Sequence, residues 1–283
     1  MDPQTVTVGD TQIRILPTVK GLVSEAKIVE DEINSFEPNL ITLSVGPEEI
    51  DGTRKWDGQP YDMSGWDEIY GLSLRKIVGD DGVRLPPPSF TKAIKLSDSK
   101  NIEVIGIDMD EESFTESYTS NVSTWQLYKR GRLEKKMVKN GIDGNTPEEM
   151  VINMENSICE IQGFAKLEND RVQTMCDNLK SNLDRSKILA IIEVSNVDSL
   201  IKLLKVEMSL PPSTTTFDII SDKKPQESHS EEKEKVIESE EVPEIEESSM
   251  EKLEKLIGMR NAGELTSEDF EEAKKEILKR KPQ

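Results

Sequence analysis

Three carboxylates stand close together directly after an apolar segment of the chain. Asp108, Asp110 and Glu112 follow residues 102–107, whose composition is typical of a buried strand. Carboxylates at the end of a strand can share a hard cation such as Mg²⁺ or Mn²⁺, because these ions prefer oxygen ligands. The spacing therefore predicts a divalent-cation site. The alternative is a solvated acidic start of a helix, where carboxylates complement the helix dipole.

A second group of candidate residues is aromatic. Trp56, Tyr61, Trp66 and Tyr70 alternate with glycine and proline in the segment that follows a second apolar run at 40–45. In open α/β sheets, ligands bind beyond the carboxyl ends of the strands. The aromatic segment therefore predicts a pocket for a small peptide or signal ligand, and the alternative is plain packing of a long loop.

Few groups in this chain suit covalent or redox chemistry. The single histidine, His229, lies in a run of Ser, Glu and Lys, which excludes Ser-His-Asp or Cys-His catalysis and His-based zinc sites from the folded part. Cys159 and Cys176 lack Cys-x-x-Cys spacing, so we expect two reduced thiols. Lys20 and Arg171 are candidate anion contacts of the pocket, unless they only pair with nearby carboxylates.

The net charge limits the classes of partner. A formal charge of -20 argues against a nucleic-acid partner, which calls for clustered Lys and Arg, and it disfavours an anionic membrane surface. No apolar stretch approaches the roughly 18 residues of a spanning helix, and the first residues lack the features of a signal peptide. We expect a cytoplasmic protein without a cofactor other than a divalent cation.

Strand-like and helix-like periodicities alternate over residues 1–212. The patterns predict an amino-terminal hairpin, a helix at 22–33, and a long helical region that begins with the Thr146 cap and ends near residue 182. Apolar runs at 40–45, 102–107 and 188–194 read as covered strands. Strands separated by helices imply right-handed crossovers, so we predict an α/β fold with a mainly parallel sheet flanked by helices.

The character of the chain changes after residue 212. Residues 213–249 hold 12 acidic and 4 basic side chains, a composition that predicts a disordered acidic linker. Residues 250–283 read as two short amphipathic helices joined at Gly263. Their apolar faces consist of Leu253, Leu256, Ile257, Phe270, Ile277 and Leu278.

This carboxy-terminal segment resembles the SHOCT domain, a short helical hairpin. The matching positions are Leu253, Arg260, Ala262, Gly263, Leu265, Thr266, Phe270 and Leu278. About thirty residues bury too little surface to be stable alone, so the apolar face needs a partner. The resemblance implies self-association, and docking on the preceding domain is the alternative.

Residues 12–205 resemble the TraB/PrgY-like group, which is related to the Tiki and erythromycin-esterase-type folds. The resemblance lies in the order and spacing of the segments 21–25, 38–41, 85–88, 107–108 and 169–172. It implies an α/β fold and, where the family's polar residues are present, metal-dependent hydrolase or peptidase activity.

This chain departs from the family at three polar positions. Leu22 stands at the place of the family's first histidine, and Ser44 at that of its glutamate. Residues 193–196 read Glu-Val-Ser-Asn where Gly-His is usual. We therefore expect a binding or regulatory protein that is oligomerised or tethered through its tail. The alternative is a metal-dependent hydrolase or peptidase that uses Asp108 and Asp110.

Overall fold

The computed structural model describes residues 2–56 and 65–208. The predicted linker at 213–249 and hairpin at 250–283 lie outside these residues. The elements are β1 (Gln4–Val8), β2 (Thr11–Thr18), α1 (Glu25–Phe36), β3 (Leu40–Leu43), α2 (Pro47–Lys55), α3 (Trp66–Val78), a short 3₁₀ helix (Asp80–Gly82), α4 (Pro88–Lys100), β4 (Glu103–Gly106), α5 (Glu111–Asn121), α6 (Thr124–Asn140), α7 (Pro147–Cys159), α8 (Gln162–Lys180), β5 (Lys187–Glu193) and α9 (Val197–Met208).

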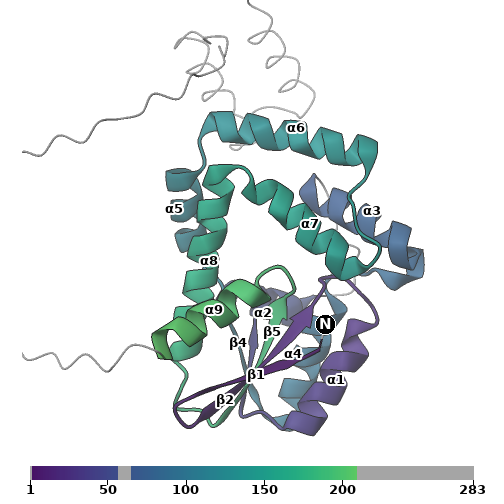
Figure 1. The fold of residues 1–283 in the computed structure, drawn as a ribbon. Helices are drawn as coiled ribbons and strands as arrows, with labels where there is room; N and C mark the ends of the chain where they lie inside the picture. The colour runs from purple at the N-terminus through teal and green to yellow at the C-terminus, as the bar shows by residue number, and fades with distance from the viewer. Residues whose placement is uncertain (1, 57–64, 209–283) are drawn as a thin grey trace, which may run out of the picture. The chain divides into compact units, whose positions relative to one another are not determined.

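Within the described residues, the strands form one five-stranded sheet in the order β1-β2-β5-β3-β4. β1 pairs with β2 in an antiparallel hairpin, and the other neighbouring strands are parallel. The predicted α/β class with a mostly parallel sheet is confirmed. β5, the last strand in sequence, lies between β2 and β3, so the carboxyl ends of four parallel strands meet at one edge (Figure 1).

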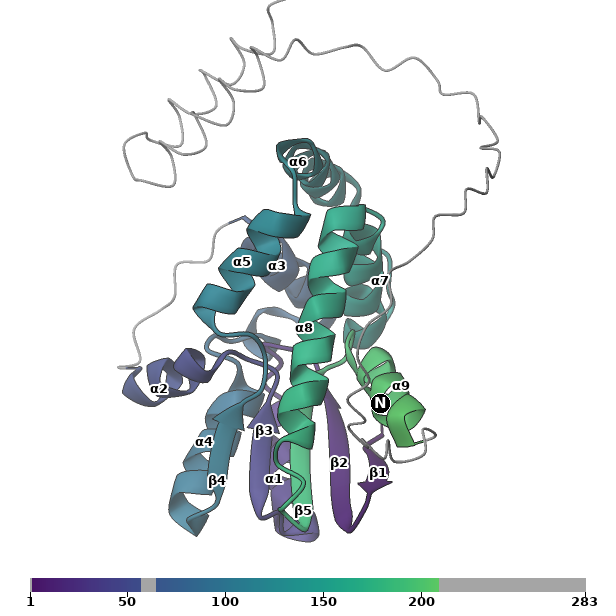
Figure 2. The same cartoon turned by 90° about the vertical axis from the view of Figure 1, so that its left-hand side faces the viewer.

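Helices cover both faces of this sheet (Figure 2). On one face, Val29 and Ile33 of α1 and Phe90 of α4 pack against strand residues such as Ile41. On the other face, apolar residues of α8 and α9 pack against alternate side chains of the same strands. Double coverage explains why the strands are apolar runs instead of alternating patterns.

A second helical layer stands beyond the carboxyl edge of the sheet. It contains α3, α5, α6, α7 and the first turns of α8 (Figure 1). The long helical region predicted from Thr146 is two helices, because Ile161 leaves helical geometry between α7 and α8. The Thr146 hydroxyl accepts a hydrogen bond from the Glu149 N–H, as its sequence position predicts. In the part of the chain that is described, no helix combines the length and the apolar composition needed to cross a bilayer.

Candidate ligand-binding site

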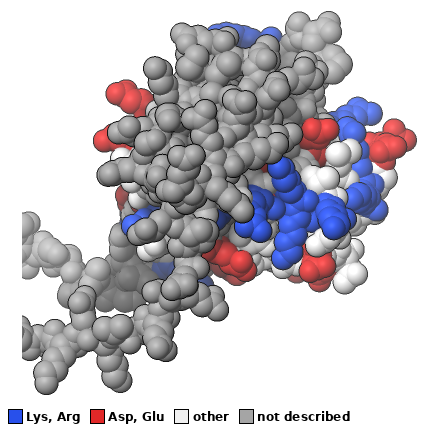
Figure 3. Space-filling view, turned by 90° about the horizontal axis from the view of Figure 1, so that it is seen from above, with Lys and Arg blue, Asp and Glu red and all other residues white. Residues whose placement is uncertain are grey.

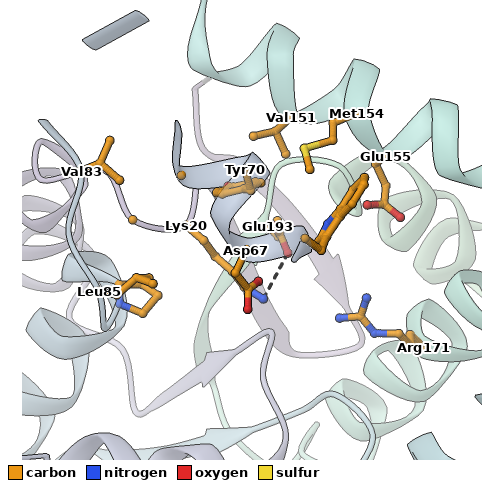
Figure 4. A pocket seen from close by; sticks show the side chains of 14 residues that line it. Lys20, Asp67, Tyr70, Val83, Leu85, Val151, Met154, Glu155, Arg171 and Glu193 are labelled. Atoms are coloured by element: carbon orange, nitrogen blue, oxygen red, sulfur yellow. Dashed lines mark ion pairs between the residues drawn. The ribbon is translucent and has the colours of Figure 1, made fainter. Parts of the chain in front are cut away.

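A pocket of about 240 Å³ lies where the carboxyl ends of β2 and β5 meet the helical layer. Its floor is formed by Lys20 and Gly21, which follow β2, and by Glu193, the last residue of β5. α3 and α7 form its walls, together with the segment around Val83 and Leu85, and Arg171 of α8 closes one side (Figure 4). The pocket therefore occupies the position at which open α/β sheets bind ligands.

Lys20 and Glu193 form an ion pair on the floor of this pocket. The Nζ atom of Lys20 lies 3.3 Å from Oε2 of Glu193 (Figure 4). Lys20 follows β2 and Glu193 ends β5, so the parallel pairing of the two strands brings them together. The nearby Glu193 carboxylate raises the pKa of Lys20, and this effect outweighs burial, which lowers it. Lys20 therefore stays protonated at neutral pH.

Buried polar contacts hold the backbone on both sides of this ion pair. The Val19 N–H donates to Oε1 of the buried Glu25, 3.2 Å away, and burial raises the pKa of that carboxyl group. The Glu193 N–H donates to the hydroxyl of Ser44 at 3.1 Å, and Ser44 is almost fully buried. Ser44, where the family resemblance places a glutamate, thus accepts a hydrogen bond from the backbone of β5.

Leu22, at the place of the family's histidine, does not line the pocket. It forms an isolated antiparallel bridge with Val83 and is buried in an apolar cluster with Leu74. Gly21, just before it, lines the pocket with a φ of 91°, a left-handed conformation that favours glycine. The segment after β2 therefore turns one apolar side chain inward and presents Lys20 to the pocket.

Arg171 neutralises two carboxylates at the side of the pocket. Its guanidinium lies 2.5 Å from Asp108 and 2.7 Å from Glu168. Burial alone would lower the pKa of Arg171, but Glu168 and Asp108 raise it further. Asp108 also accepts a hydrogen bond from the Met109 N–H at 2.8 Å. Arg171 thus ties α8 to the end of β4, and little of its charge is left for another anion.

Two carboxylates of the pocket lining, Asp67 of α3 and Glu155 of α7, form no salt bridge to a described residue. Asp67 is exposed to solvent, whereas Glu155 is half-buried. The Cys159 thiol donates to Oε1 of Glu155 at 3.9 Å. Burial, followed by the charges of Glu168 and Glu193, raises the pKa of Glu155 to about 7. Burial and Glu155 likewise raise the pKa of Cys159 to about 12. The pocket thus contains a carboxylate whose pKa lies near neutrality, and the Cys159 thiol beside that carboxylate stays protonated.

Two aromatic residues of α3 form the opposite wall. Trp66 and Tyr70 line the pocket one helical turn apart. The Tyr70 hydroxyl is buried close to the Lys20 backbone but makes no hydrogen bond of good geometry to a described residue. Burial, with the charges of Glu193 and Glu25, raises the pKa of Tyr70 well above its usual value. It therefore remains a neutral donor that a ligand acceptor could satisfy.

The predicted site residues fall into three groups. Lys20, Trp66 and Arg171 line one pocket, which joins residues that are far apart in the sequence. Trp56 is half-buried and lies outside the pocket lining. Tyr61 lies outside the described residues, as do the predicted oligomerisation positions of the tail.

The three predicted metal ligands have different local roles. Asp108 is buried and paired with Arg171. Asp110 caps α5 by accepting a hydrogen bond from the Ser113 N–H at 2.8 Å, which lowers its pKa. Glu112 is exposed in the first turn of that helix. Residues 2–56 and 65–208 contain no group of three His, Cys, Asp or Glu side chains arranged to hold a metal ion. The cation site stays a prediction.

Sequence reasoning missed the carboxylates that dominate this pocket. Glu193 ends an apolar strand, so the rule that selected Asp108 could have selected it as well. Glu155 and Glu168 carry no such signal. Glu168 lies three residues before Arg171 on α8, whereas Glu155 is on α7, and only the packing of α7 against α8 brings Glu155 near Arg171.

No protein-family model matches this sequence, and no curated protein matches it. The resemblances to the TraB/PrgY-like group and to the SHOCT domain therefore rest on the sequence patterns themselves.

Proposed function

We propose that this chain is a binding or regulatory protein whose pocket takes a small ligand with a protonated amine and an apolar substituent. The free amino end of a short apolar peptide has both features. This assignment narrows the peptide or signal ligand that the aromatic segment predicts. Trp66 and Tyr70 are the two members of that segment found in the pocket lining.

The unpaired carboxylate of Glu155 is the observation that carries the proposal. The pocket's two cations are already committed, Lys20 to Glu193 and Arg171 to Asp108 and Glu168. An added anion would meet carboxylates with no free cation. An ammonium group would instead stabilise the charged form of Glu155, whose pKa is raised by burial and then by the charges of Glu168 and Glu193. Charge-assisted hydrogen bonds are also the stronger kind.

The remaining walls suit the apolar part of such a ligand. Val83, Leu85, Val151 and Met154 contribute aliphatic surface to the pocket (Figure 4). A cavity of about 240 Å³ holds the end of a peptide and not a folded partner. The amine would then lie between Glu155 and the aromatic wall, where ring faces also attract cations.

Two further parts of the proposal come from the family resemblances. We regard the described domain as a TraB/PrgY-like fold that has lost its catalytic groups, and the SHOCT-like tail as an element for self-association or tethering. The alternative hydrolase would need Asp108 as a metal ligand. Its present ion pair with Arg171 makes that alternative the weaker one.

Calorimetry at pH 7 with leucyl-leucine amide and its N-acetyl derivative tests the proposed ligand class. We expect the free amine to bind and the acetylated peptide not to bind, because acetylation removes the charge. Glu155→Gln should weaken binding about tenfold, as expected for the loss of one charge-assisted hydrogen bond. Glu160→Gln, at an exposed carboxylate one residue after α7, is the matched control. Equal affinity for both peptides would contradict the proposal.

A further inference from the structure

The outward face of α6 carries a concentration of positive charge that the composition of the chain does not suggest. Its exposed charged side chains are all basic and recur at helical spacing. They are Lys129, Arg132, Lys135, Lys136 and Lys139. From Lys129 to Lys139 the helix rises about 15 Å. We refer to these five residues as the basic face of α6.

The basic face is distinct from the side of α6 that packs against the domain. Leu133 and Met137 turn inward to the apolar cluster beneath the helix. Arg130 also turns inward, where it pairs with Glu134 at 3.2 Å and lies over the Trp66 ring. The single acidic residue of the helix is thereby neutralised internally, so it does not offset the exposed lysines and arginine.

Figure 3 looks down on the side of the domain that carries α6 and shows blue Lys and Arg side chains gathered there, with red carboxylates beside them. The net charge of -20 therefore does not describe this surface. At physiological ionic strength, charges are screened over about 8 Å. A partner that contacts α6 consequently senses mainly the local positive charge.

An exposed aromatic pair extends the basic face at the amino end of the helix. Trp125 and Tyr128 are 40% and 37% exposed, and their rings stack with centroids 5.2 Å apart. The Lys129 ammonium lies 5.9 Å from the Trp125 ring centroid. Large exposed aromatic side chains next to clustered lysines mark surfaces that contact another body.

We infer that α6 is a docking surface for the anionic headgroups of a lipid bilayer, with the basic face over the phosphates and Trp125 and Tyr128 at the interfacial level. A helix whose basic side chains recur over about 15 Å can meet a flat anionic surface with several charges at once. Trp and Tyr rings prefer the membrane interface because their apolar bodies and polar tips suit its gradient of polarity.

Two other anionic partners fit these observations less well. Single-stranded nucleic acid would need free ring faces for base stacking, but Trp125 and Tyr128 stack on each other. An acidic peptide would gain specificity from a groove or from pockets between side chains, whereas the basic face lies on the exposed side of one helix. Both remain outcomes of the test below.

The test is flotation of the full chain with vesicles of phosphatidylcholine alone or mixed with phosphatidylserine. We expect binding to the mixed vesicles only, and its loss at high salt. The variant Lys129→Gln/Arg132→Gln/Lys136→Gln should bind at least tenfold more weakly, since each basic residue near such a surface contributes about fivefold. The control Lys55→Gln/Lys95→Gln/Lys100→Gln changes the net charge equally at exposed positions of α2 and α4 and should bind as the unaltered chain does.

Several results would overturn the inference. Absence of binding to the mixed vesicles would do so, as would equal weakening by the two triple variants, because net charge alone would then be responsible. Binding of poly-glutamate or oligo-thymidylate through the basic face, without vesicle binding, would assign the surface to an acidic protein or to nucleic acid. Far-ultraviolet circular dichroism of each variant confirms that the helices are intact.

Discussion

Lys20 and Glu193 lie 3.3 Å apart although 172 residues separate them in the sequence. Each stands at the carboxyl end of its strand, and β2 and β5 are neighbours in the sheet because the last strand inserts between β2 and β3. The pair therefore forms only when β5 has paired with β2. The same ion pair thus joins the ends of two strands and forms part of the pocket floor.

Removing one member of this pair should cost more than removing both. Lys20→Met leaves the largely buried Glu193 carboxylate without its cation and should lower the free energy of unfolding by about 1 to 2 kcal/mol. The double variant Lys20→Met/Glu193→Gln should recover part of this loss. Urea unfolding of the four proteins in this cycle measures the coupling. Additive effects of the two substitutions would show that the ion pair contributes nothing.

Arg171 should contribute more to stability than an exposed arginine with two partners. Arg171→Leu leaves Asp108 and Glu168 unpaired, with side chains only 7% and 15% exposed, and should cost about 3 kcal/mol. The control Arg54→Leu removes exposed pairs with Asp51 and Asp98 and should cost no more than about 1 kcal/mol. Equal midpoints of denaturation for the two variants would contradict this assignment.

Glu155 should make stability fall as the pH rises. Its pKa is raised from 4.5 to about 7, so between these values the folded chain retains a proton that the unfolded chain has lost. The stabilising effect of that proton is present below pH 4.5 and is lost as the pH rises through 7. Glu155→Gln should therefore raise the free energy of unfolding by about 1 to 3 kcal/mol at pH 8 and leave it little changed at pH 4.

Thermal unfolding across this pH range, with Glu160→Gln as the control, checks the prediction. The same substitution should weaken binding of the dipeptide amine at pH 7. We therefore expect Glu155 to strengthen ligand binding and to lower the free energy of unfolding. A variant that lost both stability and binding would instead point to a structural role for Glu155.

The carboxy-terminal segment should determine the assembly state. We expect the full chain to have a larger solution mass than one molecule, and a chain ending at Pro212 to be monomeric. The two amphipathic helices predicted for residues 250–283 would have an apolar face that needs a partner. Light scattering of both proteins measures this. The substitution Phe270→Glu in the full chain should reproduce the effect of truncation. Equal monomeric masses would rule out self-association through the tail.

The fold class and the principal strands could be predicted from the sequence because their signals are local. Buried strands are apolar runs, and the Thr146 cap and the hairpin turn at Gly9 are recorded in a few adjacent residues. The pocket candidates Lys20 and Arg171 could also be found, since each lies at the end of a strand or on an amphipathic helix. Asp108 met the same rule, but nothing local reveals that its partner is a guanidinium 63 residues away.

By itself, the amino-acid sequence determined the alternation of strands and helices, the absence of histidine from residues 2–208, and the acidity of the chain as a whole. Only the tertiary structure decided which charges meet. Strand order places Glu193 beside Lys20, tertiary packing brings Asp108 and Glu155 near Arg171, and burial raises the pKa of Glu155. The basic face of α6 could not be predicted from the net charge either. Composition sums charge over the whole chain, whereas electrostatic interactions in salt act over about 8 Å.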